Sequence, residues 1–144
     1  YGRQYEVVPP FLSLDLNRHH YPCHPKSWGS KLVEPVAKAF EARPEGSHEQ
    51  VIEKHTYDGF FQTELLSFLI KHRVRTAVLV GAETQICVFA TAKSAALHQF
   101  NTVIVEDGVW TSREDLGAGA LTIFLEAYGS TAGSPAILEP KPHA

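Results

Sequence analysis

Cys87 stands at the junction between a strand-like and a helix-like run, in VLVGAETQICVFATAKSAALHQFNTVIVEDG (78–108). Near a helix N-terminus, unpaired backbone N–H groups and the helix dipole stabilise a thiolate, which is the nucleophilic form of cysteine. The same N–H groups can hold the oxyanion of a tetrahedral intermediate. The position therefore makes Cys87 a candidate nucleophile.

Three other roles for Cys87 compete with this one. Free cysteine is among the most buried residue types, so Cys87 also fits a packing position in a helix. A redox role is disfavoured because no C-x-x-C pair is present. A zinc site is disfavoured because nothing around Cys87 has ligand spacing. The position at the junction favours the nucleophile.

Two further reactive side chains follow predicted strands. Asp15 ends the strand-like FLSLDL (11–16), and Lys54 ends or follows the strand-like HEQVIEKH (48–55). Right-handed crossovers bring the carboxyl ends of parallel strands to one sheet edge, where ligands bind. A lysine there would favour the Cys87 thiolate. Taken singly, Lys54 is also typical of an exposed lysine at a strand end.

Strand and helix patterns alternate along the chain, which predicts an α/β protein with a parallel sheet and helices on both faces. The run at 76–81 is apolar enough for a strand covered on both faces, and Phe61, Leu65, Phe68 and Leu69 form an apolar helical stripe. The predicted strands are 11–16, 48–55, 76–81, 102–107 and 134–138, and the predicted helices are 31–42, 58–73, 85–100 and 114–129. A loop is expected at 17–30.

The composition is ordinary for one soluble domain: 144 residues, 44% of them hydrophobic, with a formal net charge of -3. No basic-aromatic stripe indicates nucleic acid, and the apolar runs are too short to span a membrane. No signal peptide is visible. Two cysteines far apart, Cys23 and Cys87, favour a reducing compartment, so we expect a cytoplasmic protein.

An ordered set of motifs resembles a known family. EKHTYDGFFQTEL (53–65) supplies a lysine and then F-x-x-T-x-L, and VLVGAETQICVFATAKSAA (78–96) supplies G-x-x-T-x-x-C-V. TVIVEDGVWTSRED (102–115) is similar to the strand and acidic turn that follow. This set resembles the isochorismatase-like cysteine hydrolases, which include the nicotinamidases. The resemblance implies a three-layer α/β/α fold with a mainly parallel, Rossmann-like sheet.

The resemblance also implies a mechanism. Cys87 would attack a small amide and form a thioester, releasing ammonia. Lys54 would stabilise the thiolate and help to move a proton. The N–H groups of Glu83 and Cys87 would hold the oxyanion, and the Ala82–Glu83 peptide bond would be cis, as in relatives.

Several neighbouring side chains have expected roles. Tyr57 and Trp110 fall in predicted loops near strand ends and, with Thr84, are candidates to line the substrate pocket. Phe61 and Phe68 are assigned to packing. Glu83 is expected to pair with a cation, either Lys93 or Arg113, although contact with substrate is an alternative.

The chain departs from the family pattern near its start. The third catalytic residue, an aspartate on the family's first strand, has no match, and deleting a central strand would leave neighbouring edges unpaired. We therefore expect one domain over residues 1–144 that lacks its N-terminal strand because a segment precedes Tyr1. A changed fold and a loss of catalysis are the two alternative explanations.

Asp15 matches instead the metal site of nicotinamidases. Those enzymes use D-x-H and W-P-x-H; here Asn17 replaces the first histidine, and YPCH supplies His24, with His19 or His20 as possible substitutes. Asp15 and His24 are therefore candidate ligands of a divalent ion, Zn, Ni or Fe. Solvated loop histidines are the alternative. No organic cofactor is expected.

These observations predict a nicotinamidase-like amidohydrolase acting on a small-molecule amide. A vinyl-ether or ureido hydrolase of the same family is one alternative, and an inactive relative acting as a binding or scaffold subunit is another. Relatives commonly form dimers or tetramers, so a homo-oligomer is expected. No nucleic-acid or membrane partner is expected.

Overall fold

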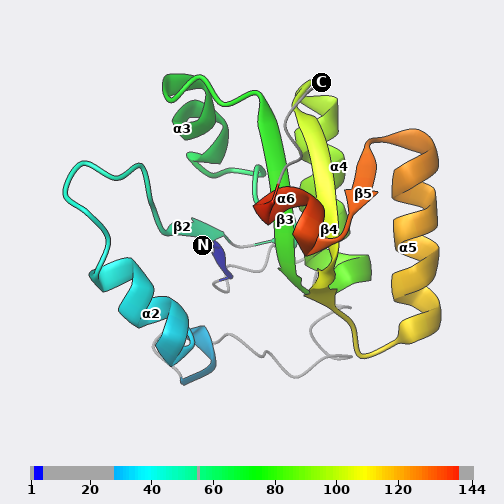
Figure 1. Ribbon diagram of the computed structural model, residues 1–144, viewed down its shortest axis with the longest axis horizontal. Coiled ribbons are helices and arrows are strands. Elements are labelled where there is room, and N and C mark those ends of the chain that lie inside the picture. The colour runs from blue at the N-terminus through cyan, green and yellow to red at the C-terminus, as the bar shows by residue number, and fades with distance from the viewer. Residues whose placement is uncertain (1, 5–27, 55, 140–144) are drawn as a thin grey trace, which may run out of the picture. The chain divides into compact units, whose positions relative to one another are not determined.

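The computed structural model describes residues 2–4, 28–54 and 56–139 (Figure 1). Its contacts divide the chain into two compact units, each described by itself. The first unit comprises Tyr1–Thr56 with Phe61–Glu64, and the second comprises Tyr57–Phe60 with Leu65–Ala144.

The first unit contains a two-stranded parallel sheet and one longer helix. Its elements are β1 (Gly2–Gln4), the 3₁₀ turn η2 (Trp28–Ser30), α2 (Glu34–Glu41) and β2 (Ile52–Lys54). β1 pairs with β2, with Arg3 opposite Glu53. Pro35 lies in the first turn of α2, where the missing N–H costs no helical hydrogen bond. The predicted helix at 31–42 and the short strand within 48–55 are confirmed.

The second unit is a three-stranded parallel sheet with helical connections. Its elements are α3 (Leu65–Lys71), β3 (Thr76–Ala82), the π-helical turn η3 (Thr84–Val88), α4 (Phe89–Leu97), β4 (Asn101–Trp110), α5 (Glu114–Ala127), β5 (Ser130–Ala132) and α6 (Ser134–Leu138). The strand order is β3-β4-β5 (Figure 1). The parallel α/β class expected from the sequence is confirmed.

The core of the second unit lies between the sheet and the pair α4 and α5. Val88, Ala92, Ile104 and Phe124 form its buried cluster. Because alanine has the smallest apolar side chain, Ala92 and the buried Ala95 let α4 approach β4 closely. The small-residue helix recognised in the sequence is thus the helix that packs against the sheet.

The predicted last strand at 134–138 is wrong, because this segment is the helix α6. Among the described residues the last strand is β5 (Ser130–Ala132), which begins four residues earlier and pairs with β4. Two features favour the helix: Pro135 lies in its first turn, and the carboxylate of Asp107 accepts hydrogen bonds from the Ser134 N–H and hydroxyl. The capping group comes from β4, so local pattern does not reveal it.

The predicted helix at 58–73 is shorter than expected and covers only Leu65–Lys71. Gln62 has a φ of 53°, in the left-handed region, which interrupts a right-handed helix. Phe61 is 52% exposed, so its assignment to packing is wrong, whereas Phe60 is buried. Phe68 is half-buried and its ring lies 4.6 Å from that of His72.

The two faces of β3 differ in exposure. Leu79 packs against the core, while Val78 and Val80 on the opposite face are 45% and 64% exposed. The expectation that this strand is covered on both faces is therefore wrong.

The predicted strand at 11–16 and most of the predicted loop at 17–30 lie outside the described residues. None of the helices within the described ranges has the length and apolar character that a membrane span requires.

Candidate active site

Cys87 lies in η3, the turn that joins the end of β3 to α4. This turn is π-helical: the Val88 N–H donates to the Glu83 carbonyl, five residues earlier, at 3.2 Å. Such single π-turns are frequent at functional sites. Cys87 is half-buried and forms no disulfide with any described residue. It therefore lies at the carboxyl end of a parallel strand, where ligands of α/β sheets bind.

The backbone before this turn has the geometry that the resemblance implies. The peptide bond between Ala82 and Glu83 is cis. Gly81, at the end of β3, has a φ of 123°, which an L side chain rarely adopts. The expected oxyanion role of the Glu83 and Cys87 N–H groups stays a prediction.

Thr84 joins the cysteine turn to the neighbouring strand. Its hydroxyl donates to the Trp110 carbonyl at 3.0 Å, and its side chain is only 2% exposed. The hydroxyl thus has a partner in the protein backbone, and this observation favours a structural role over the expected place in a substrate pocket. Trp110, the last residue of β4, exposes 62% of its surface.

Glu83 does not pair with either expected cation, so that prediction is wrong. Its carboxylate accepts hydrogen bonds from Gln85 Nε2 at 2.6 Å and from the Ser112 hydroxyl at 3.0 Å. Lys93 instead places its ammonium 5.7 Å from the centre of the Tyr128 ring. Glu83 consequently links the cysteine turn to the loop after β4 through neutral donors.

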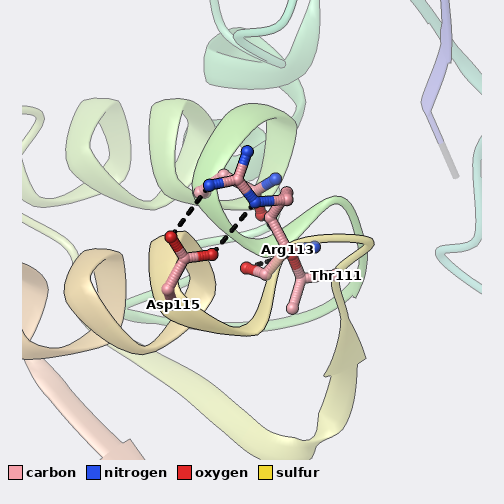
Figure 2. A network of polar contacts seen from close by, with 4 residues as sticks. Thr111, Arg113 and Asp115 are labelled. Atoms are coloured by element: carbon pink, nitrogen blue, oxygen red, sulfur yellow. Dashed lines mark hydrogen bonds and ion pairs between the residues drawn. The ribbon is translucent and has the colours of Figure 1, made fainter.

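Arg113, the other expected partner, pairs with Asp115 (Figure 2). Its Nε and Nη2 donate to the two carboxylate oxygens at 3.1 and 2.9 Å. The hydrogen bonds from Arg113 lower the pKa of Asp115, and those to Asp115 raise the pKa of Arg113. The two residues lie two positions apart, so this local pairing keeps the guanidinium away from Glu83.

Thr111 connects this pair to the cysteine turn. Its hydroxyl donates to Gln85 Oε1 at 2.7 Å and accepts from the Arg113 N–H at 3.0 Å. Figure 2 shows Thr111, Arg113 and Asp115 close together at the start of α5. The end of β4 and the loop after it are therefore attached to the 83–88 turn at three places, through Trp110, Thr111 and Ser112.

Lys54 belongs to the first unit and is the last residue of β2, so its expected place at a strand end is confirmed. It is only 8% exposed, which is rare for a lysine, and its ammonium donates to the Thr56 carbonyl at 2.8 Å. Tyr57, three residues later, belongs to the second unit and is 39% exposed.

The expected metal ligands Asp15 and His24 lie outside the described residues, as do His19 and His20. Among the residues that the structure does describe, no group of three histidine, cysteine, aspartate or glutamate side chains could hold a metal ion. The metal site therefore stays a prediction.

One set of polar contacts was not expected from the sequence. Asp58, in the segment after Lys54, accepts a hydrogen bond from Ser94 on α4, and the neighbouring Gly59 donates to Thr91 on the same helix. In the sequence, these contacts could have been indicated by Thr91 and Ser94, two hydroxyl residues that lie three positions apart in an alanine-rich helix.

Comparisons with known proteins point to one family. The family model of the isochorismatase domain matches residues 8–132. Maleamate amidohydrolase from Pseudomonas putida is 35% identical over 81 residues, covering 56% of this chain and 38% of that protein. Ureidoacrylate amidohydrolase RutB from Acinetobacter baylyi is 32% identical over 83 residues, covering 58% and 31%. The matched regions therefore span less than half of each of these two relatives.

A solved structure shows the same fold. The nicotinamidase PncA from Bacillus subtilis superposes with a TM-score of 0.78 at 21% identity, covering 92% of this chain and 73% of that one.

Proposed function

The chain belongs to the isochorismatase family, and we propose that it is a cysteine-dependent hydrolase of a small amide. One observation carries this proposal: Cys87 occupies a half-buried π-helical turn at the carboxyl end of a parallel strand. A cysteine that served only for packing would not need to lie in a turn at the carboxyl end of a strand. Family membership adds relatives whose names describe amide hydrolysis.

The proposed reaction has two steps. The Cys87 thiolate attacks the amide carbon, the C–N bond breaks, and the nitrogen leaves with a proton as ammonia. Water then attacks the resulting thioester, releasing the carboxylic acid and restoring the thiol. Lys54 stabilises the thiolate and helps to move the proton.

The N–H groups of Glu83 and Cys87 hold the oxyanion in both steps. Backbone donors suit this role because they are fixed before the reaction and need no reorganisation. The hydrogen bonds of Thr84 and of the Glu83 carboxylate attach this turn to β4 and the loop after it, which supports a rigid oxyanion site.

Two aromatic residues are proposed to contact the substrate. Tyr57 and Trp110 are both partly exposed, and each stands at or after a strand end. A planar amide such as nicotinamide would suit aromatic neighbours. Maleamate and ureidoacrylate are the alternative substrates suggested by the names of the relatives.

The oligomeric state and the cellular compartment are also proposed. We expect the protein to form a homo-oligomer and to act in the cytoplasm, as the resemblance and the cysteine usage suggest. Light scattering of the purified protein tests the first, and a fluorescent fusion tests the second.

The test is ammonia release from nicotinamide, maleamate and ureidoacrylate, measured beside the rate of iodoacetamide labelling. We expect turnover of at least one amide, faster labelling of Cys87 than of Cys23, and loss of both in Cys87→Ser. Cys23→Ser is the matched control and should keep both. Ordinary labelling of Cys87 in folded protein, with no turnover, would instead favour an inactive binding subunit.

A further inference from the structure

Glu83 begins the turn that carries Cys87, and its backbone is bonded to that turn. The Glu83 carbonyl accepts from the Ile86 N–H at 3.1 Å and from the Val88 N–H at 3.2 Å, so these two hydrogen bonds bracket Cys87 in the chain. Four positions of helical chain correspond to about 6 Å along the axis. The side chain of Glu83 therefore starts about one turn from the thiol, within the second unit.

The carboxylate of this half-buried glutamate is held by neutral donors. Gln85 Nε2 and the Ser112 hydroxyl both donate to the same oxygen, Oε2, at 2.6 and 3.0 Å. Gln85 is fixed in turn by the Thr111 hydroxyl, which donates to its Oε1 at 2.7 Å. Among the described residues, none donates to the other carboxylate oxygen of Glu83, Oε1. The carboxylate thus has a fixed place and one oxygen left to accept.

The described lysines and arginines of the second unit are committed to other partners or lie at the other end of the sheet. Arg113 donates through Nε and Nη2 to Asp115 (Figure 2), and Lys93 places its ammonium over the Tyr128 ring. The others come before the start of β3, whose seven residues span about 20 Å. They are Lys71, Arg73 and Arg75. Within the described part of this unit, no cation therefore neutralises the charge of Glu83.

A fixed carboxylate at this place acts on the charge of a bound substrate. The Glu83 N–H is one of the two groups proposed to hold the oxyanion, so the reacting amide binds against this residue. Like charges brought together in a partly desolvated site repel more strongly than in water. A neutral substrate meets no such repulsion, and an N–H group on it can donate to a carboxylate oxygen.

We propose that Glu83 is a specificity-determining residue, which selects neutral amides over amides that carry a carboxylate. This inference rests on the proposed function and deepens it by naming the charge class of the substrate. It favours nicotinamide and neutral diamides over maleamate and ureidoacrylate, because each of the latter two carries a carboxylate.

The test compares two amides that differ in charge and share one carbon frame. Maleamate has one amide and one carboxylate, and maleamide has two amides. Initial rates of ammonia release by the intact protein give kcat/KM for each, before the product of maleamide accumulates. We expect the wild type to prefer maleamide by about 10-fold per amide group. An amide that is not turned over is compared through its inhibition constant against the best substrate.

Glu83→Gln removes the charge and keeps an oxygen that can accept from Gln85 and Ser112. We expect the preference to fall to about 3-fold or less, mainly through a lower KM for maleamate. Glu126→Gln is the matched control. It removes an equal charge from the exposed last turn of α5, a helix of 14 residues and about 20 Å, and should leave the preference unchanged.

A second measurement needs no variant. Raising the salt concentration from about 0.05 M to about 0.5 M screens the repulsion and should narrow the preference of the wild type. A selection based on shape alone would not respond to salt, since the two amides have nearly the same shape. This measurement decides the matter if Glu83→Gln does not fold.

The outcomes distinguish this inference from the proposed function. A preference that neither salt nor folded Glu83→Gln changes would overturn the selection by Glu83 and leave the hydrolase in place. So would a wild type that prefers maleamate, or an equal narrowing in Glu126→Gln, because net charge would then set the preference. No ammonia from these two amides, nicotinamide or ureidoacrylate would remove the proposed function, and the selection with it.

Discussion

The Thr84 hydroxyl lies 3.0 Å from the Trp110 carbonyl oxygen and attaches the turn that carries Cys87 to the end of β4. The two residues are 26 positions apart in the chain, so this contact depends on the parallel pairing of β3 with β4. The orientation of the cysteine turn is therefore coupled to the neighbouring strand.

Replacing Thr84 with valine should destabilise the protein. Valine preserves the shape but leaves the Trp110 carbonyl without this donor in a position where Thr84 is almost fully buried. We expect the free energy of unfolding to fall by about 1–3 kcal/mol in urea titrations. Thr122→Val, on the exposed face of α5, should change it by less than about 0.5 kcal/mol. Equal effects of the two substitutions would contradict the role given to Thr84.

Gly129→Ala should also destabilise the fold. A Cβ at this position would lie 2.5 Å from the Thr102 carbonyl oxygen and 2.7 Å from the Phe124 ring, so either backbone or core must move. We expect a loss of about 1–3 kcal/mol. Gly119→Ala is a matched control within α5, where a Cβ meets nothing within 4 Å. It should stabilise by about 0.5–1 kcal/mol because alanine favours helix. A thermal midpoint that rises in both variants would contradict the close packing of Gly129 against Thr102 and Phe124.

The contact between Asp107 and α6 should depend on pH. Hydrogen bonds from the Ser134 hydroxyl and N–H lower the pKa of Asp107. Because the folded-state pKa lies below the unfolded one, the stabilisation is present above about pH 4 and is lost as pH falls through the folded-state value. In thermal unfolding from pH 6 to pH 2, the wild type should lose its advantage over Asp107→Ala at the acidic end. A constant difference across this range would show that the carboxylate charge is unimportant.

The predicted metal site gives a direct chemical test. Purified protein should contain close to one equivalent of Zn, Ni or Fe by elemental analysis, and Asp15→Ala and His24→Ala should each reduce it. Chelation should then lower turnover of nicotinamide, because the ion would polarise its ring nitrogen. Purified protein that holds no metal and hydrolyses maleamate or ureidoacrylate would favour a non-nicotinamide substrate. It would also contradict the prediction that Asp15 and His24 are metal ligands.

Local patterns alone predicted much of the second unit. The spacing of the apolar residues indicates a strand in the run of β3 and a helix in the small-residue run of α4. Strand and helix patterns alternate again after α4. The order of these elements can therefore be predicted without a structure. The position of Cys87 between strand and helix follows from that order. The lysine at the end of β2 follows from the same kind of pattern in the first unit.

Patterns failed where the deciding partner is distant in the chain. The run at 134–138 resembles a strand by composition, yet Asp107, 27 residues away from Ser134, caps it as a helix. Phe60 and Phe61 are equally apolar, and docking on α4 decides that Phe60 is the buried one.

The sequence by itself determined the parallel α/β class, the cysteine at the strand-to-helix junction and the lysine at a strand end, because these depend on residue type and short spacing. Only the tertiary structure decided that Glu83 bonds to Gln85 and Ser112, and that Asp58 bonds to Ser94. A carboxylate accepts from any donor within reach. Which donor lies within reach is set by strand pairing and helix packing, and not by the residues beside it.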